Sequence, residues 1–407
     1  MERKEVEIEQ TSIEIIDGDR GKNYPKNNEL TSSGYCLFLS AANVTKSGLQ
    51  FINNSFITKE KDALLRKGKL FLNDIVLTTR GTVGNVGLYS DDVPFKNMRI
   101  NSGMVIIRPG KDFDTMFLYQ YLRSCYFKAQ ITQYQSGSAQ PQLPISTLQK
   151  MKVIKPNIAA QRRIASILSS LDRKIELNNM INANLEEMAQ AIFKNWFVDF
   201  EPFKDGKFVD SELGMIPEGW KVGTLGDITK NKSAKVKERN DVKVLSPVTT
   251  GELVLSEEYF TKQVFSSSIA KYKIVNKGDF AYNPARVNIG SLGRNEFDFD
   301  GCVSPVYVVF SVLDGYENYF DLFRKTDFFK DSVASLAIGG VRQSLSYDDL
   351  SLIETIIPSE NIVEKFNNLY NQMKKTIKAN KKESSRLSLL RDTLLPRLMS
   401  GEIEIPK

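Results

Sequence analysis

The side chains best suited to chemistry in this chain are hydrogen-bonding ones in two glycine-rich loops. The first loop follows an apolar run and carries Thr79, Arg80, Thr82 and Asn85. Glycines let a backbone approach a phosphate, an Arg can bond a guanine edge with two hydrogen bonds, and an Asn can do the same to an adenine. These residue types predict contact with DNA. The alternative is an ordinary hairpin whose Arg is merely solvated.

The same loop chemistry occurs a second time, about half the chain later. This second glycine-rich loop contains Asn283, Arg286 and Asn288.

Each of these loops has a companion, a small polar loop placed just before a strand. The first companion loop offers Ser138, Gln140 and Gln142, and its counterpart offers Arg342, Gln343 and Ser344. The two companions differ at their hydrogen-bonding positions, which predicts that they recognise different DNA half-sites. Neutral drift in a turn is the other explanation.

Basic loops near the start of each half could bind phosphates without sequence preference. Their cationic residues are Arg20, Lys22, Lys26, Lys235, Lys237 and Arg239. Solvation alone would also account for them.

The usual catalytic residues and motifs are missing from the sequence. The 407 residues include no His, which removes the commonest general base and nearly every zinc site. No Pro is followed by Pro or Asp, as an adenine methyltransferase or a common acidic nuclease would require, and no Gly-Lys pair precedes Ser or Thr, as a phosphate-binding loop would require. We therefore expect a chain without catalytic activity, metal site or bound cofactor.

Bulk properties agree with a cytoplasmic protein. The net charge of +6 permits nucleic acid without demanding it. No apolar run approaches the roughly 18 residues needed to cross a bilayer, and the charged N-terminus lacks the apolar stretch of a signal peptide. The three scattered cysteines, Cys36, Cys125 and Cys302, suit reduced thiols. We expect no membrane contact.

A tandem duplication positions these loops. Shifting the sequence by 202 residues aligns Gly137 with Gly339, Leu148 with Leu350 and Pro156 with Pro358 without a gap. Further upstream the offset is 205 to 206, where Asp74 meets Asp279 and Arg80 meets Arg286. Each half therefore carries the same pair of loops on the same scaffold.

Each copy divides into a globular part and a long helix. Short β-branched and aromatic runs, such as Leu70–Leu77 and Gly103–Ile107, predict an α+β domain with a small, irregular sheet. Two segments without Pro or Gly, Ile158–Phe200 and Asn361–Leu395, predict helices. The expected divisions are a domain at 1–156, a helix at 157–200, a domain at 201–358, and a helix with a C-terminal tail at 359–407.

Both helices show an apolar seam with heptad-like spacing and a polar middle. The polar positions are Asn178 and Asn182 in the first helix and Asn380 and Ser384 in the second. A buried polar layer fixes register and partner orientation, so the two helices are expected to pair. Alternatively, each helix packs on its own domain and the Asn residues face water.

Four segments together resemble the specificity subunits of type I restriction–modification enzymes. They are Ile15–Lys22, the central run Ala191–Phe203, the stretch Leu213–Ile228, and the ending Leu390–Ile403. The Pro-Glu-Gly-Trp entry at Pro217–Trp220 has no counterpart before Val6, so the first domain begins short.

The resemblance implies two pseudo-symmetric target-recognition domains, separated by two long helices that pair as an antiparallel coiled coil. Such a subunit reads a bipartite target in double-stranded DNA. It docks two methylation subunits, which use S-adenosylmethionine, and in the complete nuclease two ATP-driven restriction subunits. Candidate docking residues are Trp196, Phe197, Phe200, Leu394, Leu395 and Leu398, although core packing is the leading interpretation of the aromatic ones. A two-domain adaptor that binds protein instead of DNA is the competing function.

Overall fold

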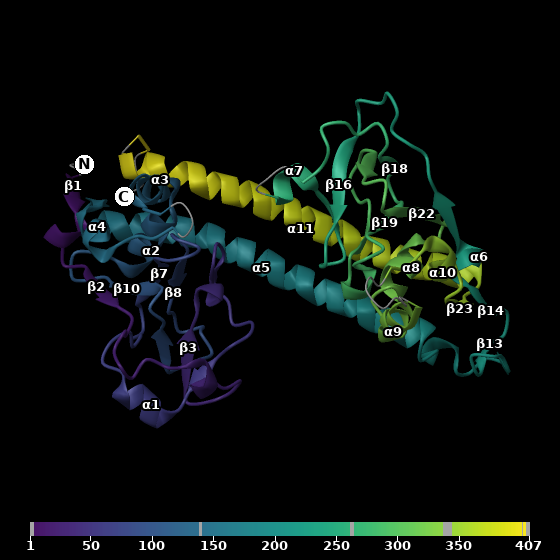
Figure 1. Ribbon diagram of the computed structural model, residues 1–407, viewed down its shortest axis with the longest axis horizontal. Coiled ribbons are helices and arrows are strands. Elements are labelled where there is room, and N and C mark those ends of the chain that lie inside the picture. Colours follow the sequence, from purple (N-terminus) through teal and green to yellow (C-terminus); the bar gives the residue numbers. More distant parts are fainter. Residues whose placement is uncertain (1–3, 138–140, 261–263, 337–343, 401, 404–407) are drawn as a thin grey trace. The chain divides into compact units, whose positions relative to one another are not determined.

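The computed structural model describes residues 4–137, 141–260, 264–336, 344–400 and 402–403. The chain forms two compact units, and each is described by itself. Unit 1 comprises residues 1–179 and 380–407, and unit 2 comprises residues 180–379. Two long helices, α5 (Ile158–Phe197) and α11 (Glu360–Ser400), each contribute one part to each unit (Figure 1).

Unit 1 is built on a four-stranded sheet in the order β2-β10-β7-β8. Its strands are β1 (Lys4–Glu7), β2 (Glu14–Asp17), β3 (Cys36–Leu39), β4 (Val44–Thr45), β5 (Gly48–Leu49), β6 (Phe56–Ile57), β7 (Ile75–Thr78), β8 (Val86–Leu88), β9 (Met98–Ile100), β10 (Met104–Arg108) and β11 (Lys152–Lys155). Its shorter helices are α1 (Lys59–Leu64), α2 (Thr115–Arg123), α3 (Cys125–Tyr134) and α4 (Ile145–Lys150).

Unit 2 repeats this plan with the four-stranded order β15-β22-β19-β20. Its strands are β12 (Phe208–Val209), β13 (Ile216–Pro217), β14 (Lys221–Thr224), β15 (Thr229–Lys232), β16 (Lys243–Pro247), β17 (Leu253–Leu255), β18 (Lys273–Val275), β19 (Phe280–Tyr282), β20 (Leu292–Arg294), β21 (Gly301–Val303), β22 (Val308–Val312) and β23 (Glu354–Ile357). Its shorter helices are α6 (Leu225–Ile228), α7 (Ser256–Tyr259), α8 (Glu317–Phe323), α9 (Asp327–Leu336) and α10 (Tyr347–Ser351).

The central sheet of each unit is buried on both faces. In unit 1, Ile75 and Leu77 pack with the helices, while Val76 between them packs with the small β6-β3-β9 sheet. In unit 2, Phe280 and Tyr282 join the helix side and Ala281 joins the other side. Because successive side chains of a strand point to opposite faces, two-sided burial explains why these strands read as unbroken apolar runs.

The two units match in the order of their strands and also in the directions of the paired strands. The central sheet of each unit, β2-β10-β7-β8 or β15-β22-β19-β20, is antiparallel throughout. The second sheet, β6-β3-β9 in unit 1 and β17-β16-β21-β18 in unit 2, contains one parallel pair, β3 with β9 and β16 with β21. In each unit the strand that leads into the long helix pairs antiparallel with an early strand, β11 with β1 and β23 with β14. The predicted α+β fold with pseudo-symmetric domains is confirmed.

Several element boundaries differ from the sequence prediction. The first long helix, predicted to reach Phe200, ends at Phe197, and Phe200 itself adopts a left-handed conformation with φ 54°. The strand expected over Leu70–Leu77 begins only at Ile75, because the carboxylate of Asp74 accepts a hydrogen bond from the backbone N–H of Phe71 and closes a turn before it. The second long helix continues through Pro396 to Ser400. Leu395, Leu398 and Met399 are buried there, and their packing outweighs the cost of a Pro inside a helix.

The long helices pair antiparallel in both units. In unit 1, Asp172 contacts Arg391 and Asn178 contacts Glu383 and Ser384, so the numbering runs in opposite directions. In unit 2, the ring of Phe366 lies against those of Phe193, Trp196 and Phe197. The predicted seam and its polar middle are buried or half-buried throughout: Ile164, Leu168, Leu171, Ile175, Asn178, Asn182, Leu185, Ala189, Ile192 and Trp196 on α5, and Phe366, Tyr370, Met373, Ile377, Asn380, Ser384, Leu387, Arg391, Leu394 and Leu398 on α11. The prediction of an antiparallel helix pair is confirmed, and Asn178 does not face water, since its side chain is 0% exposed.

Candidate nucleic-acid interface

The first glycine-rich loop connects β7 to β8 and is fixed from its base. The hydroxyl of the buried Thr78 donates to the carbonyl oxygen of Thr82 and accepts a hydrogen bond from the N–H of Asn85 at 2.9 Å. Two glycines bend the chain with positive φ, +74° at Gly81 and +94° at Gly84, which glycine adopts without a steric penalty. The tip of the loop therefore has a defined position.

The fold brings the companion loop of the same domain against this one. The N–H of Leu143 donates to the carbonyl oxygen of Thr79 at 2.9 Å, and Arg80 pairs with Gln142 in an isolated antiparallel bridge. The N–H and C=O groups of Ser136 and Gln142 also bond to each other, at 2.9 and 2.8 Å. Helices α2 and α3 return the chain to this edge of the sheet, so two loops far apart in sequence form one surface.

The predicted side chains of this surface divide into exposed and internal ones. Arg80, Thr82 and Gln142 are exposed. Thr79 is buried and its hydroxyl donates to the carbonyl oxygen of Gly103 at 3.1 Å, while the Asn85 amide donates to the carbonyl oxygen of Val44 at 2.9 Å. Thr79 and Asn85 thus hold the loop in place, and the capacity to bond a ligand rests with the exposed residues.

Unit 2 contains the equivalent surface. Its loop runs from β19 to β20 through Asn283, Arg286 and Asn288, and the N–H of Leu345 donates to the carbonyl oxygen of Pro284 at 3.1 Å, as Leu143 does to Thr79. The Asn283 side chain accepts from the N–H of Ala285 at 3.1 Å and so shapes the turn. Arg286, Asn288 and Ser344 are exposed.

Four of the predicted residues lie outside the described part of the chain: Ser138, Gln140, Arg342 and Gln343.

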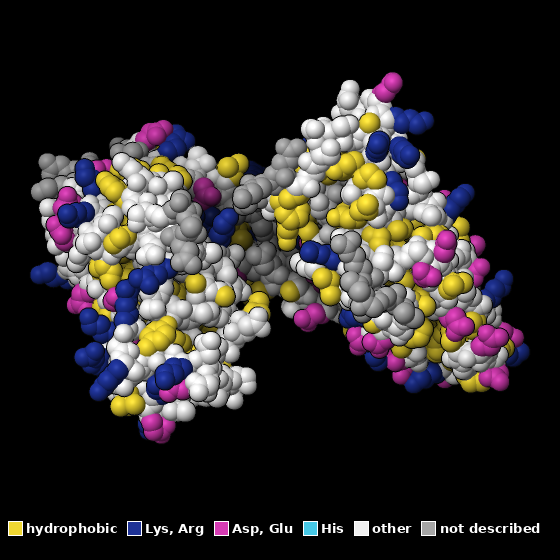
Figure 2. All heavy atoms as spheres, in the orientation of Figure 1, with side chains coloured by type: hydrophobic (Ala, Val, Ile, Leu, Met, Phe, Trp, Pro, Cys, Tyr) yellow, Lys and Arg dark blue, Asp and Glu magenta, His cyan; other side chains and the backbone are white. Residues whose placement is uncertain are grey.

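The predicted basic loops lie on the surface of their own units. Arg20, Lys22 and Lys26 are exposed in unit 1, as are Lys235 and Lys237 in unit 2. Arg20 also pairs with the Asp17 carboxylate at 3.1 Å. Arg239 is half-buried and pairs with the carboxylates of Asp241 and Asp300 at 2.5 and 3.1 Å. On the face shown in Figure 2, Lys and Arg side chains gather over the part of unit 1 that contains β2 and α1.

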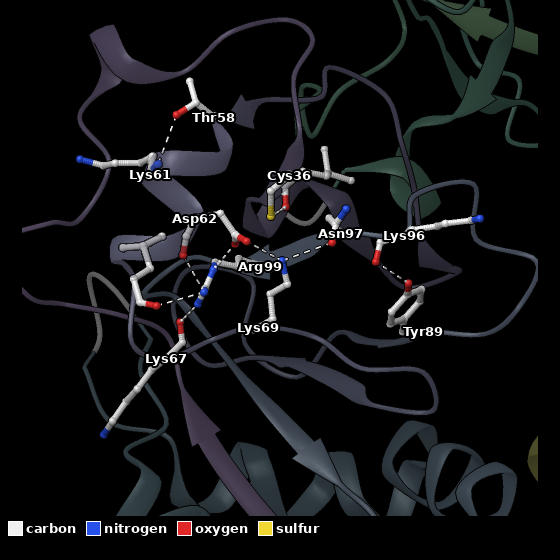
Figure 3. Close-up of polar contacts among 12 residues, drawn as sticks. Cys36, Thr58, Lys61, Asp62, Lys67, Lys69, Tyr89, Lys96, Asn97 and Arg99 are labelled. Atoms are coloured by element: carbon white, nitrogen blue, oxygen red, sulfur yellow. Dashed lines mark hydrogen bonds and ion pairs between the residues drawn. The ribbon is translucent and has the colours of Figure 1, made fainter.

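A buried ion-pair cluster in unit 1 was not predicted from the sequence (Figure 3). The Asp62 carboxylate of α1 bonds Nε of Arg99 on β9 at 2.5 Å and Nζ of Lys69 at 2.7 Å. Burial alone would raise the pKa of Asp62, but Lys69 and Arg99 outweigh it and leave the pKa below its ordinary value. Beside them, burial raises the pKa of the Cys36 thiol to about 12. The partners are up to 37 residues apart, so no local motif marks the cluster.

The predicted docking residues lie in or against the hydrophobic cores. Phe197, Leu395 and Leu398 are no more than 5% exposed. Trp196, Phe200 and Leu394 are half-buried and pack against the same cores. Their contacts match the core-packing interpretation, and a partner could reach at most the edges of the half-buried ones.

The described residues offer neither a metal-binding cluster nor a membrane-spanning helix. The described ranges contain no group of three His, Cys, Asp or Glu side chains arranged to hold a metal ion. Within the same part of the chain, no helix combines the length and apolarity that spanning a bilayer would take.

Comparisons with known proteins give one consistent result. A family model described as type I restriction modification DNA specificity domain matches residues 9–187. The type I restriction enzyme MjaIX specificity subunit of Methanocaldococcus jannaschii is 28% identical over 343 residues, which is 81% of this chain and 78% of that protein. The HindI specificity subunit of Haemophilus influenzae is 24% identical, over 95% of this chain and 98% of that protein. The solved S subunit of a type I restriction–modification system from M. genitalium has the same fold, with a TM-score of 0.57 at 16% identity and coverage of 100% and 97%.

Proposed function

Because the chain belongs to the family of type I restriction–modification DNA-specificity subunits, we propose that it reads a bipartite DNA target, one half-site for each recognition domain. We assign residues 1–156 and 201–358 to the recognition domains. Residues 157–200 and 359–407 hold the spacer helices and the tail.

The observation that carries this proposal is the recurrence of one surface in both repeats. Each unit joins the loop of its β7–β8 or β19–β20 hairpin to a second loop through one equivalent backbone hydrogen bond. Each presents one exposed Arg, Arg80 or Arg286, that forms no ion pair with a carboxylate of the described residues. An Arg held on a fixed backbone with a free guanidinium suits bidentate contact with a guanine.

The remaining contacts follow from exposure. Thr82 and Gln142 in unit 1, and Asn288 and Ser344 in unit 2, can bond base edges or phosphates. The half-buried side chain of Asn283 supports its own loop as well as facing the DNA. Ser138, Gln140, Arg342 and Gln343 are proposed as contacts on their residue type and position alone.

The chain acts without catalysis of its own, as a subunit that guides others. We propose that it docks two methylation subunits, which supply S-adenosylmethionine, and in the complete nuclease two ATP-driven restriction subunits, in the cytoplasm. The purified chain mixed with S-adenosylmethionine and DNA is expected to transfer no methyl group. The protein-binding adaptor, the competing function, is not favoured.

Substitution of one Arg per domain tests the proposal. With the cognate methylation subunits, Arg80→Ala should relax recognition at a position in one half-site and leave the other half-site unchanged, and Arg286→Ala should do the reverse. A lost bidentate contact costs about 1–3 kcal/mol of discrimination. Arg173→Ala on α5, where the side chain is also exposed, is the control and should leave the methylated sequence unchanged. Mapping of methylated bases gives the readout, and an unchanged target in both loop variants would refute the assignment.

A further inference from the structure

Two basic loops of unit 1 are held together by one buried carboxylate. Asp19, which is 6% exposed, accepts hydrogen bonds from the N–H of Gly21 and from the N–H of Arg66, each at 2.7 Å. Arg66 lies 47 residues from Asp19 in sequence. The bonds fix the loop that carries Lys22 next to the loop that carries Arg66 and Lys67.

The loop that carries Arg66 and Lys67 is also held by the buried side chain of Arg99. The guanidinium of the buried Arg99 donates to the carbonyl oxygen of Leu65 at 3.0 Å and to that of Lys67 at 2.7 Å. Both carbonyls that flank Arg66 are therefore held by one side chain, which the Asp62 carboxylate holds in turn. In Figure 3 the Lys67 side chain points away from this cluster.

The result is a rigid backbone with its cations turned outward. Lys22, Arg66 and Lys67 are all exposed, and none forms an ion pair with a carboxylate among the described residues. The Arg66 guanidinium lies beside Gly21, because a Cβ on that glycine would be 3.2 Å from Nη2 of Arg66. Exposed cations that form no internal ion pair remain available to an anion from outside.

Unit 2 builds a similar surface by other means. The N–H groups of Val236 and Lys237 donate to the carbonyl oxygens of Tyr272 and Ala270, both at 2.9 Å, so a basic loop again lies beside the segment that precedes the central hairpin. Lys235, Lys237 and Lys271 are exposed there. At the offset of 205 that relates Asp74 to Asp279, Lys271 corresponds to Arg66. The cation recurs although the group that positions it has changed.

From this geometry we propose that Lys22, Arg66 and Lys67 form a phosphate clamp, a sequence-independent contact with the DNA backbone that is separate from the base-reading loops. The clamp rests on the proposed function. It identifies Asp19 and Arg99 as positioning residues for a contact to which they do not themselves contribute.

The test measures how DNA affinity depends on salt. The full chain assembled with its methylation subunits binds a duplex that carries the mapped target and a scrambled duplex, over a series of salt concentrations. Each phosphate contact contributes about 0.9 to the slope of log affinity against log salt. The double substitution Arg66→Gln with Lys67→Gln should lower the magnitude of this slope by about 1.8. It should weaken the binding of both duplexes by the same factor, on the order of tens of fold at 0.1 M salt.

Two further variants keep the result interpretable. Lys111→Gln with Lys150→Gln removes two exposed charges elsewhere in unit 1 and should leave the slope unchanged. Arg66→Lys with Lys67→Arg keeps both charges and should keep the slope, because a phosphate contact requires charge and not a particular side chain. An unchanged slope in the Gln variant overturns the clamp, as does a loss confined to the target duplex, which would indicate base contact. If the unsubstituted complex binds no DNA, the proposed function itself fails.

Discussion

Asp172 ties three helices of unit 1 together, and its replacement should loosen all of them. Its carboxylate on α5 accepts from Nη1 of Arg391 on α11 at 2.6 Å, and from Nε2 of Gln120 and Nη1 of Arg123 on α2 at 2.5 and 3.1 Å. The Asp172 side chain is 25% exposed, while Arg123 and Arg391 are 17% and 19% exposed. Asp172→Asn would leave two half-buried guanidinium groups without their shared anion.

The size of the loss follows from this partial burial. Breaking a fully buried ion pair from one side costs about 3–5 kcal/mol, and a surface pair is worth about 0–1 kcal/mol. Since the amide keeps the shape of the carboxylate and one acceptor oxygen, we expect a loss of about 2–3 kcal/mol. That loss corresponds to an equilibrium constant for local opening of the helices that is about 30- to 150-fold larger.

Amide hydrogen exchange can locate the effect. Peptides from α2 and from the unit 1 part of α5 should exchange faster by that factor, because exchange through local opening reports the local free energy. Asp392→Asn is the matched control: it removes a carboxylate from the same Arg391, but Asp392 is 63% exposed and its loss should cost less than about 0.5 kcal/mol. Equal exchange rates in the two variants would refute the reasoning.

The pH dependence provides a second check. Burial would raise the pKa of Asp172, yet Arg123, Gln120 and Arg391 outweigh it and hold the pKa below its ordinary value of 3.8. A carboxylate with a lowered folded-state pKa contributes stability above its unfolded pKa and loses it as the pH falls through the folded pKa. The difference in the free energy of opening between the unsubstituted chain and the Asp172→Asn variant should therefore have its full value at pH 7 and should shrink below about pH 4. A difference that grew on acidification would contradict the assignment.

Three other predictions follow from the structure and the repeat. Asn178→Asp should destabilise unit 1 by about 1–3 kcal/mol, because it places a carboxylate beside Glu383 and leaves a buried Oδ1 that already has no partner among the described atoms. Urea titration measures the loss, and equal unfolding midpoints for the two chains would contradict it. Iodoacetamide at pH 8 should label only Cys125 in the folded chain, since Cys36 and Cys302 are buried and burial raises their pKa values to about 12 and about 11; mass spectrometry that finds either of them modified would show that its site opens. One heptad inserted beside Leu185 and another beside Leu387 should lengthen each helix by roughly 10 Å and the gap between methylated half-sites by about three base pairs, whereas an insertion outside heptad register should destabilise the chain. An unchanged gap from a folded, active complex would show that other elements set it.

Regularities along the chain were enough to predict most of the architecture. The duplication is visible because equivalent residues recur at a nearly constant offset, and the topology of the two central sheets then agrees strand for strand. The helix seam is visible because its spacing is a property of the helix itself. Residue type alone was a poorer guide to the site: the neighbours Thr79 and Arg80 both carry side chains that can hydrogen-bond to DNA, yet Thr79 is buried and Arg80 is exposed.

The sequence by itself determined that this chain is two copies of one α+β domain with two pairing helices, and which loops carry Arg, Asn and Gln. Only the tertiary structure decided which of those side chains face outward, and that Asp19 joins two basic loops while Arg99 holds the carbonyls beside Arg66. The physical reason is the range of the interactions. Periodicity and repetition are encoded between near neighbours or at a fixed offset, whereas a buried carboxylate can bond any N–H that the folded path of the chain brings within about 3 Å of it.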